Sequence, residues 1–183
     1  MAVVGASIAG CTTAMLLARA GARELLVEQR PDPDAFKRVC GHFIQASAVP
    51  TLRRTGLLEA MEGAGAVRSH GRIRTPYGVV VAPEGSGVER CVNLRREKLD
   101  PLVRRMAADT PGVELALGLT ARELVQDDGR VGGVVLERRD GTRMTVRARL
   151  VVGAVGRDSK VARMAAVPER RTRNDRFSYG MYY

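Results

Sequence analysis

The chain has 183 residues, of which 45% are hydrophobic, so it is long enough for one domain, or slightly more, with a substantial core. Its formal net charge is +10, but the basic residues are scattered and only 4% of the residues are aromatic, so nucleic-acid binding is not expected. No apolar stretch approaches the length that spans a bilayer.

The cysteines and histidines follow no pattern typical of a metal site. Cys11, Cys40 and Cys91 are widely spaced, with no Cys-x-x-Cys pair, so neither a zinc site nor a disulfide framework is predicted. This usage fits a reduced, cytoplasmic setting. The two histidines, His42 and His70, have no partner pattern, and we therefore expect no metal and assign no catalytic residue.

The first thirty residues predict a strand, a glycine-rich turn, a helix and a second strand. In order these are a strand at 2–4, a turn formed by Gly5, Ala6, Ser7, Ile8, Ala9 and Gly10, a helix at 11–20, and a strand at 24–28. Gly21 follows the helix at the expected C-terminal glycine position, and the second strand closes on Glu28. This order is typical of the βαβ unit that binds an adenine dinucleotide.

Each residue type in this unit has a physical reason. Gly5 allows the chain to turn sharply, Gly10 lets the helix lie close to the sheet, and the helix N-terminus attracts a diphosphate. Glu28 comes 23 residues after Gly5, where its carboxylate can accept hydrogen bonds from a ribose, and it would repel the 2′-phosphate of NADP. Ser7 stands at the central glycine position, where its Cβ narrows the approach to the diphosphate and its hydroxyl offers a hydrogen bond.

A secretory signal is the alternative interpretation of this region. Residues 1–21 are largely apolar, and Ala18, Arg19 and Ala20 imitate a cleavage site. No basic segment precedes the apolar run, however, and a strand with a terminal acid follows at the right distance, which favours the dinucleotide unit.

The middle of the chain predicts loops, short helices and a hairpin. The expected elements are a loop at 29–34, a helix at 45–55 (or from Pro50) stopped by Gly56, a short helix at 57–61, a β-hairpin within 66–81 and a strand at 88–94. A longer amphipathic helix is expected at 95–108, with Leu99, Leu102, Val103 and Met106 on its apolar face.

The last third predicts a return to the first sheet. The expected elements are a strand at 113–117, a three-stranded meander at 119–125, 131–138 and 142–147 with Asp-Gly turns, a buried strand at 149–153, a second glycine turn at 153–159 and a helix at 160–166. A plain nicotinamide dehydrogenase would continue instead with regular βα repeats. The fold class is therefore α/β, Rossmann-like, with a parallel sheet and an inserted meander and hairpin.

These motifs together resemble the FAD-dependent monooxygenases of the para-hydroxybenzoate hydroxylase type, a family that includes geranylgeranyl-reductase-like oxidoreductases and flavin-dependent halogenases. The resemblance covers essentially the whole chain. It rests on residues 3–10, Glu28, Arg38-Val39-Cys40-Gly41, Arg96-Glu97-Lys98-Leu99 and Gly153–Ser159.

The resemblance implies FAD as the cofactor and a set of cofactor-binding residues. The first turn would hold the diphosphate, and Glu28, with the adjacent Gln29 and Arg30, the adenosine ribose. Arg38 matches an arginine near the flavin and the incoming NAD(P)H, Arg96 a FAD contact, Ala121 a strand residue whose backbone reads the adenine, and Val155 with Gly156 the second glycine turn. Exposed surface positions are the alternative for Arg38 and Arg96, and a packing role for Cys40.

Two departures from the family pattern bear on function. Val155 replaces an aspartate of a Gly-Ala-Asp-Gly run, so we expect FAD to bind more weakly than to a Val155→Asp variant, unless the substitution is an isolated one that leaves the turn intact. The segment 173–183 begins an aromatic, alternating strand, which in the family opens the substrate domain, so residues 1–172 are expected to form the FAD-binding domain of a longer enzyme.

The expected function is the FAD-binding part of a monooxygenase that uses NAD(P)H and O₂ to hydroxylate a small organic molecule. A flavin-dependent reductase or halogenase is the alternative within the family. A catalytically inactive FAD-binding or assembly module is the alternative from another class. The oligomeric state is left open.

Overall fold

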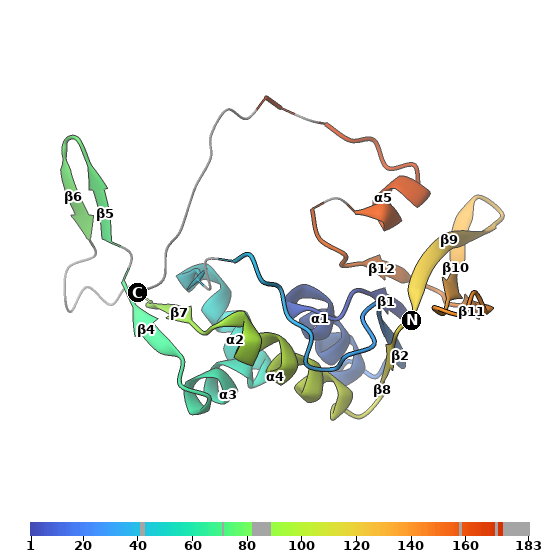
Figure 1. Cartoon of the computed structure of the whole chain (residues 1–183), viewed down its shortest axis with the longest axis horizontal. Helices are drawn as coiled ribbons and strands as arrows, with labels where there is room; N and C mark the ends of the chain where they lie inside the picture. Colours follow the sequence, from blue (N-terminus) through green and yellow to red (C-terminus); the bar gives the residue numbers. More distant parts are fainter. Residues whose placement is uncertain (41–42, 71, 82–88, 158, 171, 174–183) are drawn as a thin grey trace.

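A four-stranded parallel sheet lies at the centre of the computed structural model, which describes residues 1–40, 43–70, 72–81, 89–157, 159–170 and 172–173. The strand order is β12–β1–β2–β8 (Figure 1). The strands are β1 (Ala2–Val4), β2 (Glu24–Glu28), β8 (Val113–Leu117) and β12 (Val151–Gly153). Strand β1 therefore lies in the interior of the sheet, between β2, which is close to it in the sequence, and β12, which is distant.

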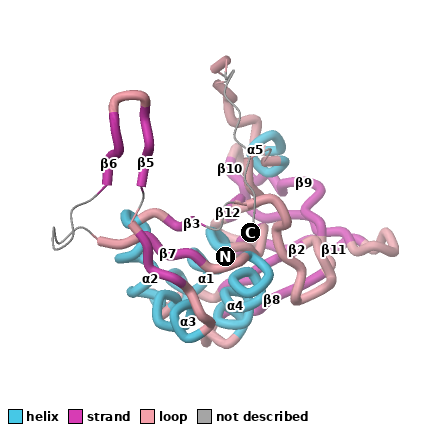
Figure 2. Tube along the Cα trace, turned by 60° about the vertical axis from the view of Figure 1, so that its left-hand side comes forward, coloured by secondary structure: helices cyan, strands magenta, loops and turns pink. Residues whose placement is uncertain are grey.

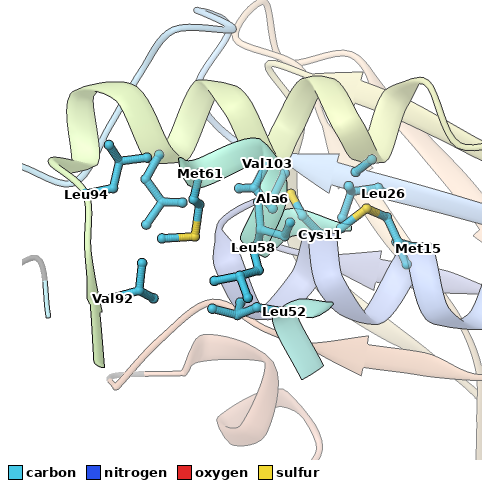
Figure 3. Packing of buried hydrophobic residues seen from close by; sticks show 14 of the residues in the cluster. Ala6, Cys11, Met15, Leu26, Leu52, Leu58, Met61, Val92, Leu94 and Val103 are labelled. Atoms are coloured by element: carbon cyan, nitrogen blue, oxygen red, sulfur yellow. The ribbon is translucent and has the colours of Figure 1, made fainter. Parts of the chain in front are cut away.

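Helices cover one face of this sheet. They are α1 (Ile8–Arg19), α2 (Val49–Thr55), α3 (Leu57–Gly63) and α4 (Arg96–Ala108), with a 3-10 turn (Ala46–Ala48) before α2. Figure 3 shows side chains of different elements meeting in one cluster, among them Met15 of α1, Leu26 of β2, Met61 of α3 and Val103 of α4, all fully buried. This cluster is the main core, and it fixes α4 beside α1.

An antiparallel meander and a short helix cover the opposite face. The meander has the order β11–β10–β9, with β9 (Thr120–Asp127), β10 (Arg130–Glu137) and β11 (Arg143–Arg147), and α5 (Lys160–Met164) packs on β9. Val4, Val27, Val134 and Leu136 belong to this second core cluster. Because both faces are covered, the central strands are apolar at successive positions rather than alternating.

The remaining strands lie at the far end of the helical side. A small sheet has the order β3–β7–β4, with β3 (Phe43–Ile44), β7 (Cys91–Asn93) and β4 (Val67–Ser69). The hairpin of β5 (Arg72–Thr75) and β6 (Gly78–Val81) projects away from the other elements in both views (Figures 1 and 2). Its Tyr77 is 99% exposed, and Val79, Val80 and Val81 are also exposed, at 48%, 61% and 44%.

The α/β fold with a parallel sheet, hairpin and inserted meander is confirmed, and several element bounds are corrected. Helix α1 begins at Ile8, not Cys11, because Ser7 already serves as its N-cap. The helix expected at 45–55 is regular only from Val49, with Pro50 in its first turn. The hairpin expected within 66–81 is formed by residues 72–81 with its turn at residues 76–77, and strand β3 was not predicted.

Some predictions concern residues outside the described part of the chain. The strand expected from 173 onward lies there apart from Arg173 itself, as do residues 41–42, Asp158 and the first residue of the strand expected at 88–94. Within the described residues, no helix combines the length and apolarity needed to cross a membrane. The same residues contain no group of three or more potential metal-ligating side chains.

Candidate dinucleotide site

Gly5 and Gly10 are required by close backbone contacts at the end of β1. Gly5 has a φ of +105°, and its amide donates to the Val27 carbonyl oxygen at 2.7 Å. A Cβ at Gly5 would lie 2.7 Å from the carbonyl oxygen of Ala154, and one at Gly10 would lie 1.8 Å from the Gly5 carbonyl oxygen. Any side chain at either position would therefore displace the turn.

The N-terminus of α1 is open to an external anion. Ser7 is the N-cap residue, but its side chain makes no capping hydrogen bond, and the first turn contains no acidic residue. The amides of Ile8, Ala9 and Gly10 belong to this first turn, so no acidic side chain of the helix itself occupies the positive end of its 12 residues. The turn is suited to a phosphate group.

Glu28 lies beside this turn at the end of β2. Its Oε2 accepts a hydrogen bond from the Ala6 amide at 3.1 Å, and its Oε1 accepts one from the Arg30 amide at 3.0 Å. The side chain is half-buried. An ionised carboxylate has about four acceptor positions, so Glu28 retains capacity for ligand hydroxyls.

Arg96 reaches the same turn from the first residue of α4. Its Nη2 donates to the Ser7 hydroxyl oxygen at 2.8 Å, while the Asp100 carboxylate accepts from Nε at 2.8 Å and from Nη2. Arg96 is only 6% exposed, so the structure excludes the surface-arginine alternative for it. The accepting Ser7 hydroxyl keeps its own proton for donation to a ligand.

The charge of Arg96 is held by its partners. Burial opposes the charged guanidinium, but the Asp100 carboxylate and the Cys40 thiol outweigh it, and the pKa of Arg96 is raised above its ordinary value. The Cys40 sulfur accepts from Nη1 at 3.5 Å, which places this half-buried cysteine beside the turn. Cys11, by contrast, is fully buried, and burial raises its pKa to about 12, so its thiol is unreactive.

The second glycine turn lies against the first. The Ala154 amide donates to the Val4 carbonyl oxygen at 2.8 Å, and the Val155 amide nitrogen would lie 3.2 Å from a Cβ at Gly5. Val155 is 40% exposed, and Gly156 has a φ of +91°. The structure thus brings together two turns that are about 150 residues apart in the sequence.

The other predicted residues lie at the margins of this arrangement. Gln29 and Arg30 are exposed directly after Glu28, and buried Ala121 follows Leu119, whose amide donates to the Glu28 carbonyl oxygen at 3.0 Å. Arg38 is exposed at a surface pocket of 580 Å³, which leaves its surface alternative open. The pocket is lined by Arg30, Asp32, Asp34, Ala35, Phe36, Lys37, Arg38 and Val39.

Sequence reasoning missed two buried charged residues of α4. Asp100 is 2% exposed and pairs with Arg96, and Arg104 is 3% exposed with its Nε donating to the Ala6 carbonyl oxygen at 3.2 Å. Positions 96, 100 and 104 recur every four residues, which places them on one face of a helix. This spacing could have predicted a shared charged face. The sequence analysis instead used the apolar positions of the same helix.

These features fit an adenine dinucleotide. The turn has two glycines at which a Cβ would collide with backbone, an open helix N-terminus for the diphosphate, and an adjacent carboxylate for a ribose.

Comparisons with known proteins agree with this geometry. Residues 1–181 match the family described as FAD binding domain. The chain is 28% identical over 169 residues to a digeranylgeranylglycerophospholipid reductase of Picrophilus torridus, covering 90% of this chain and 41% of the relative. It is 31% identical over 183 residues to a 6-methylpretetramide 4-monooxygenase of Streptomyces rimosus, covering 91% of this chain and 40% of the relative.

A solved structure shares the fold. A probable FAD-dependent monooxygenase of Pseudomonas aeruginosa, pqsL, superposes with a TM-score of 0.74 at 23% identity, over 94% of this chain and 46% of that one. The chain spans about two fifths of the length of the curated relatives named above. It belongs to the FAD binding domain family of FAD-dependent monooxygenases and related oxidoreductases, and its cofactor is FAD.

Proposed function

We propose that this chain is the FAD-binding part of a flavin-dependent monooxygenase that, in its complete form, uses NAD(P)H to hydroxylate a small organic substrate. The observation that carries the proposal is the glycine turn flanked by Glu28 on one side and by Arg96 on the other. The named monooxygenase relative supports the reaction class.

The residues around the turn have distinct proposed roles. The amides of residues 7–10, with the Arg96 guanidinium beside them, neutralise the FAD diphosphate, and Glu28 accepts hydrogen bonds from the adenosine ribose. Gln29 and Arg30 border the ribose.

Four further residues complete the proposed site. The backbone of Ala121 lies toward the adenine, and Val155 with Gly156 borders the flavin half. Arg38, exposed at the neighbouring pocket, orients the incoming nicotinamide cofactor.

When bound, FAD supplies hydride acceptance and O₂-dependent hydroxylation, which no side chain provides. The contribution of this chain is to bind and orient the cofactor. We assign no catalytic acid or base among its residues. We also place the protein in the cytoplasm and keep residues 173–183 as the proposed start of a substrate domain.

Three alternatives have specific support. A flavin-dependent reductase is favoured by the similarity to the Picrophilus torridus reductase, and a halogenase by the fold shared with a chondrochloren halogenase (TM-score 0.73, 21% identity). An inactive FAD-binding or assembly module is favoured by Val155, because valine cannot accept the hydrogen bonds of the aspartate that the family motif has there.

The binding test is a titration of FAD with the purified chain, followed by quenching of flavin fluorescence. Glu28→Gln removes the charge and turns an N–H toward a backbone donor, so we expect roughly tenfold weaker binding. Glu59→Gln, on the exposed side of α3, is the matched control and should bind like the parent. A parent chain that does not bind FAD would refute the proposal.

Reduction separates the enzyme from the binding module. We expect NADPH or NADH to bleach the flavin absorbance of the bound complex under anaerobic conditions. A bound flavin that neither reductant bleaches would support the module instead. Comparison of the two reductants also identifies the preferred nicotinamide cofactor.

A further inference from the structure

The face of α4 that meets the turn carries three buried charged side chains, one helical turn apart. Arg96, Asp100 and Arg104 are 6%, 2% and 3% exposed. A buried charge is costly unless it is paired and hydrogen-bonded, so such a series in one helix needs specific partners. Among the described residues, the hydrogen-bond partners of these three side chains lie on the cofactor turn, on the loop between β2 and β3, or within the series.

Asp100 joins two segments that surround the proposed diphosphate site. Its carboxylate accepts from Arg96 through Nε and Nη2, with a closest N···O distance of 2.7 Å, and it also accepts from the Lys37 amide at 2.9 Å. The two-point contact fixes the plane of the guanidinium, which is then aimed at Ser7. The Lys37 contact fixes the loop whose next residue is Arg38.

Arg104 holds the turn from the opposite direction. Its Nε donates to the Ala6 carbonyl oxygen at 3.2 Å, Nη2 donates to the Ala35 carbonyl oxygen at 2.8 Å, and Nη1 donates to the Pro33 carbonyl oxygen. Ala6 is fully buried, and its amide donates to Glu28. The main chain at Ala6 is therefore held by two hydrogen bonds, one from its N–H to Glu28 and one from Arg104 to its carbonyl oxygen.

We propose that Asp100 and Arg104 are positioning residues that hold the dinucleotide turn in its binding shape before the cofactor arrives. This inference rests on the proposed binding of FAD at the turn. Asp100 acts through Arg96, whereas Arg104 acts through the main chain of Ala6. A turn fixed in advance loses less conformational entropy on binding, so the two residues raise affinity without touching the ligand.

The test uses Asp100→Asn and Arg104→Lys in the full chain, with FAD and ADP titrated by calorimetry. We expect both variants to bind both ligands roughly tenfold more weakly, because each loses charge-assisted or multiple hydrogen bonds. Asp109→Asn and Arg105→Lys are the matched controls, since both residues are exposed at or next to the same helix. The controls should change affinity less than twofold.

Double variants with Arg96→Met separate positioning from general stability. In that background Asp100→Asn should cost no more than about twofold, because of the contacts by which Asp100 acts only the one with the Lys37 amide remains. Arg104→Lys should retain its tenfold cost, because its route through Ala6 is independent. A merely structural role predicts lower melting temperatures with the same FAD affinity in the folded variants.

The outcomes distinguish this inference from the function on which it rests. If the parent chain binds neither FAD nor ADP, the proposed function fails. If the parent binds both and Asp100→Asn and Arg104→Lys bind like their controls, the positioning roles alone are overturned. Asp100→Glu, which keeps the charge but displaces the carboxylate by one methylene, replaces the asparagine variant if circular dichroism shows that the latter is unfolded, and it carries the same expected loss.

Discussion

Two arginine–carboxylate networks in this protein have the same contact distance and different surroundings. Arg96 and Asp100 in α4 approach to 2.7 Å with side chains 8% and 3% exposed. In the meander, Arg143 and Glu137 also approach to 2.7 Å, but Arg143 is 55% exposed. Glu137 further pairs with Arg122, and Arg143 with Glu123, so the meander network is the more extensive of the two.

The two networks differ in how far their charged groups are exposed to water. In the meander, Arg122, Arg143 and Glu123 are largely exposed, so water competes for their contacts and screens the attraction, and the network adds little to stability. In α4, loss of one partner leaves the other charged and buried, and the pair is also tied to Ser7 and to the loop at Lys37. The number of ion pairs and their distances therefore do not show which network stabilises the protein. The burial of the pair and its hydrogen bonds to other segments do.

The largest expected effect comes from breaking each network in the same way. Arg96→Met leaves the Asp100 carboxylate buried without its cation, and we expect the free energy of unfolding to fall by about 3–5 kcal/mol. Arg143→Met should leave the urea midpoint within experimental error, since Glu137 keeps its pair with Arg122 and the Glu123 side chain is 61% exposed. Equal shifts in the two urea titrations would contradict the comparison.

A third carboxylate sharpens the comparison, because Glu24 is buried like Asp100 but has no arginine. It is 2% exposed, neither of its oxygens has a hydrogen-bond partner among the described residues, and burial raises its pKa, with the Met1 amino group partly opposing. A raised folded-state pKa favours the protonated form. The stability that protonated Glu24 contributes is fully present below a pH of about 4.3, which is its pKa in the unfolded chain. It is lost as the pH rises through the pKa of Glu24 in the folded protein.

The neutral variant Glu24→Gln should therefore be more stable than the parent at pH 7.5, by about 1 kcal/mol, and nearly equal to it at pH 4. Thermal unfolding measured across this range gives the difference directly. Glu114→Gln, at an exposed position of the neighbouring strand β8, should show no such pH-dependent gain. A Glu24→Gln advantage that does not depend on pH would show that the effect is not due to ionisation.

The smallest effect is expected where a carboxylate is added at an exposed site. Val155→Asp introduces an acceptor without a burial penalty, because Val155 is 40% exposed beside the first turn. We expect FAD affinity to rise several-fold, or about 1 kcal/mol, through hydrogen bonds to ligand hydroxyls. Val167→Asp, at a valine that is 57% exposed, is the control, and equal FAD affinities of parent and Val155→Asp by fluorescence titration would refute the expectation.

Much of the fold was predictable because its signals are local. The strand at 113–117 was predicted with the bounds that β8 has, and the meander strands were predicted within two residues, because alternation and Asp-Gly turns set their limits. The start of α1 was predicted three residues late, since Ile8, Ala9 and Gly10 are compatible with both turn and helix. Strand β3 has two residues and depends on pairing with β7, so it left no local pattern.

The sequence by itself determined the glycine turn, the carboxylate of Glu28 and the family, because each follows from residue types at short, fixed spacings. The tertiary structure decided that Arg96 is buried against Ser7, that Asp100 and Arg104 meet the loop and turn, and that Val155 lies beside Gly5. These contacts join residues 63 to 150 positions apart, and the packing of α4 and β12 around β1 creates them. The spacing of residues along the chain does not indicate such long-range contacts. They form because a charged side chain that is buried in the folded core needs a hydrogen-bonded partner.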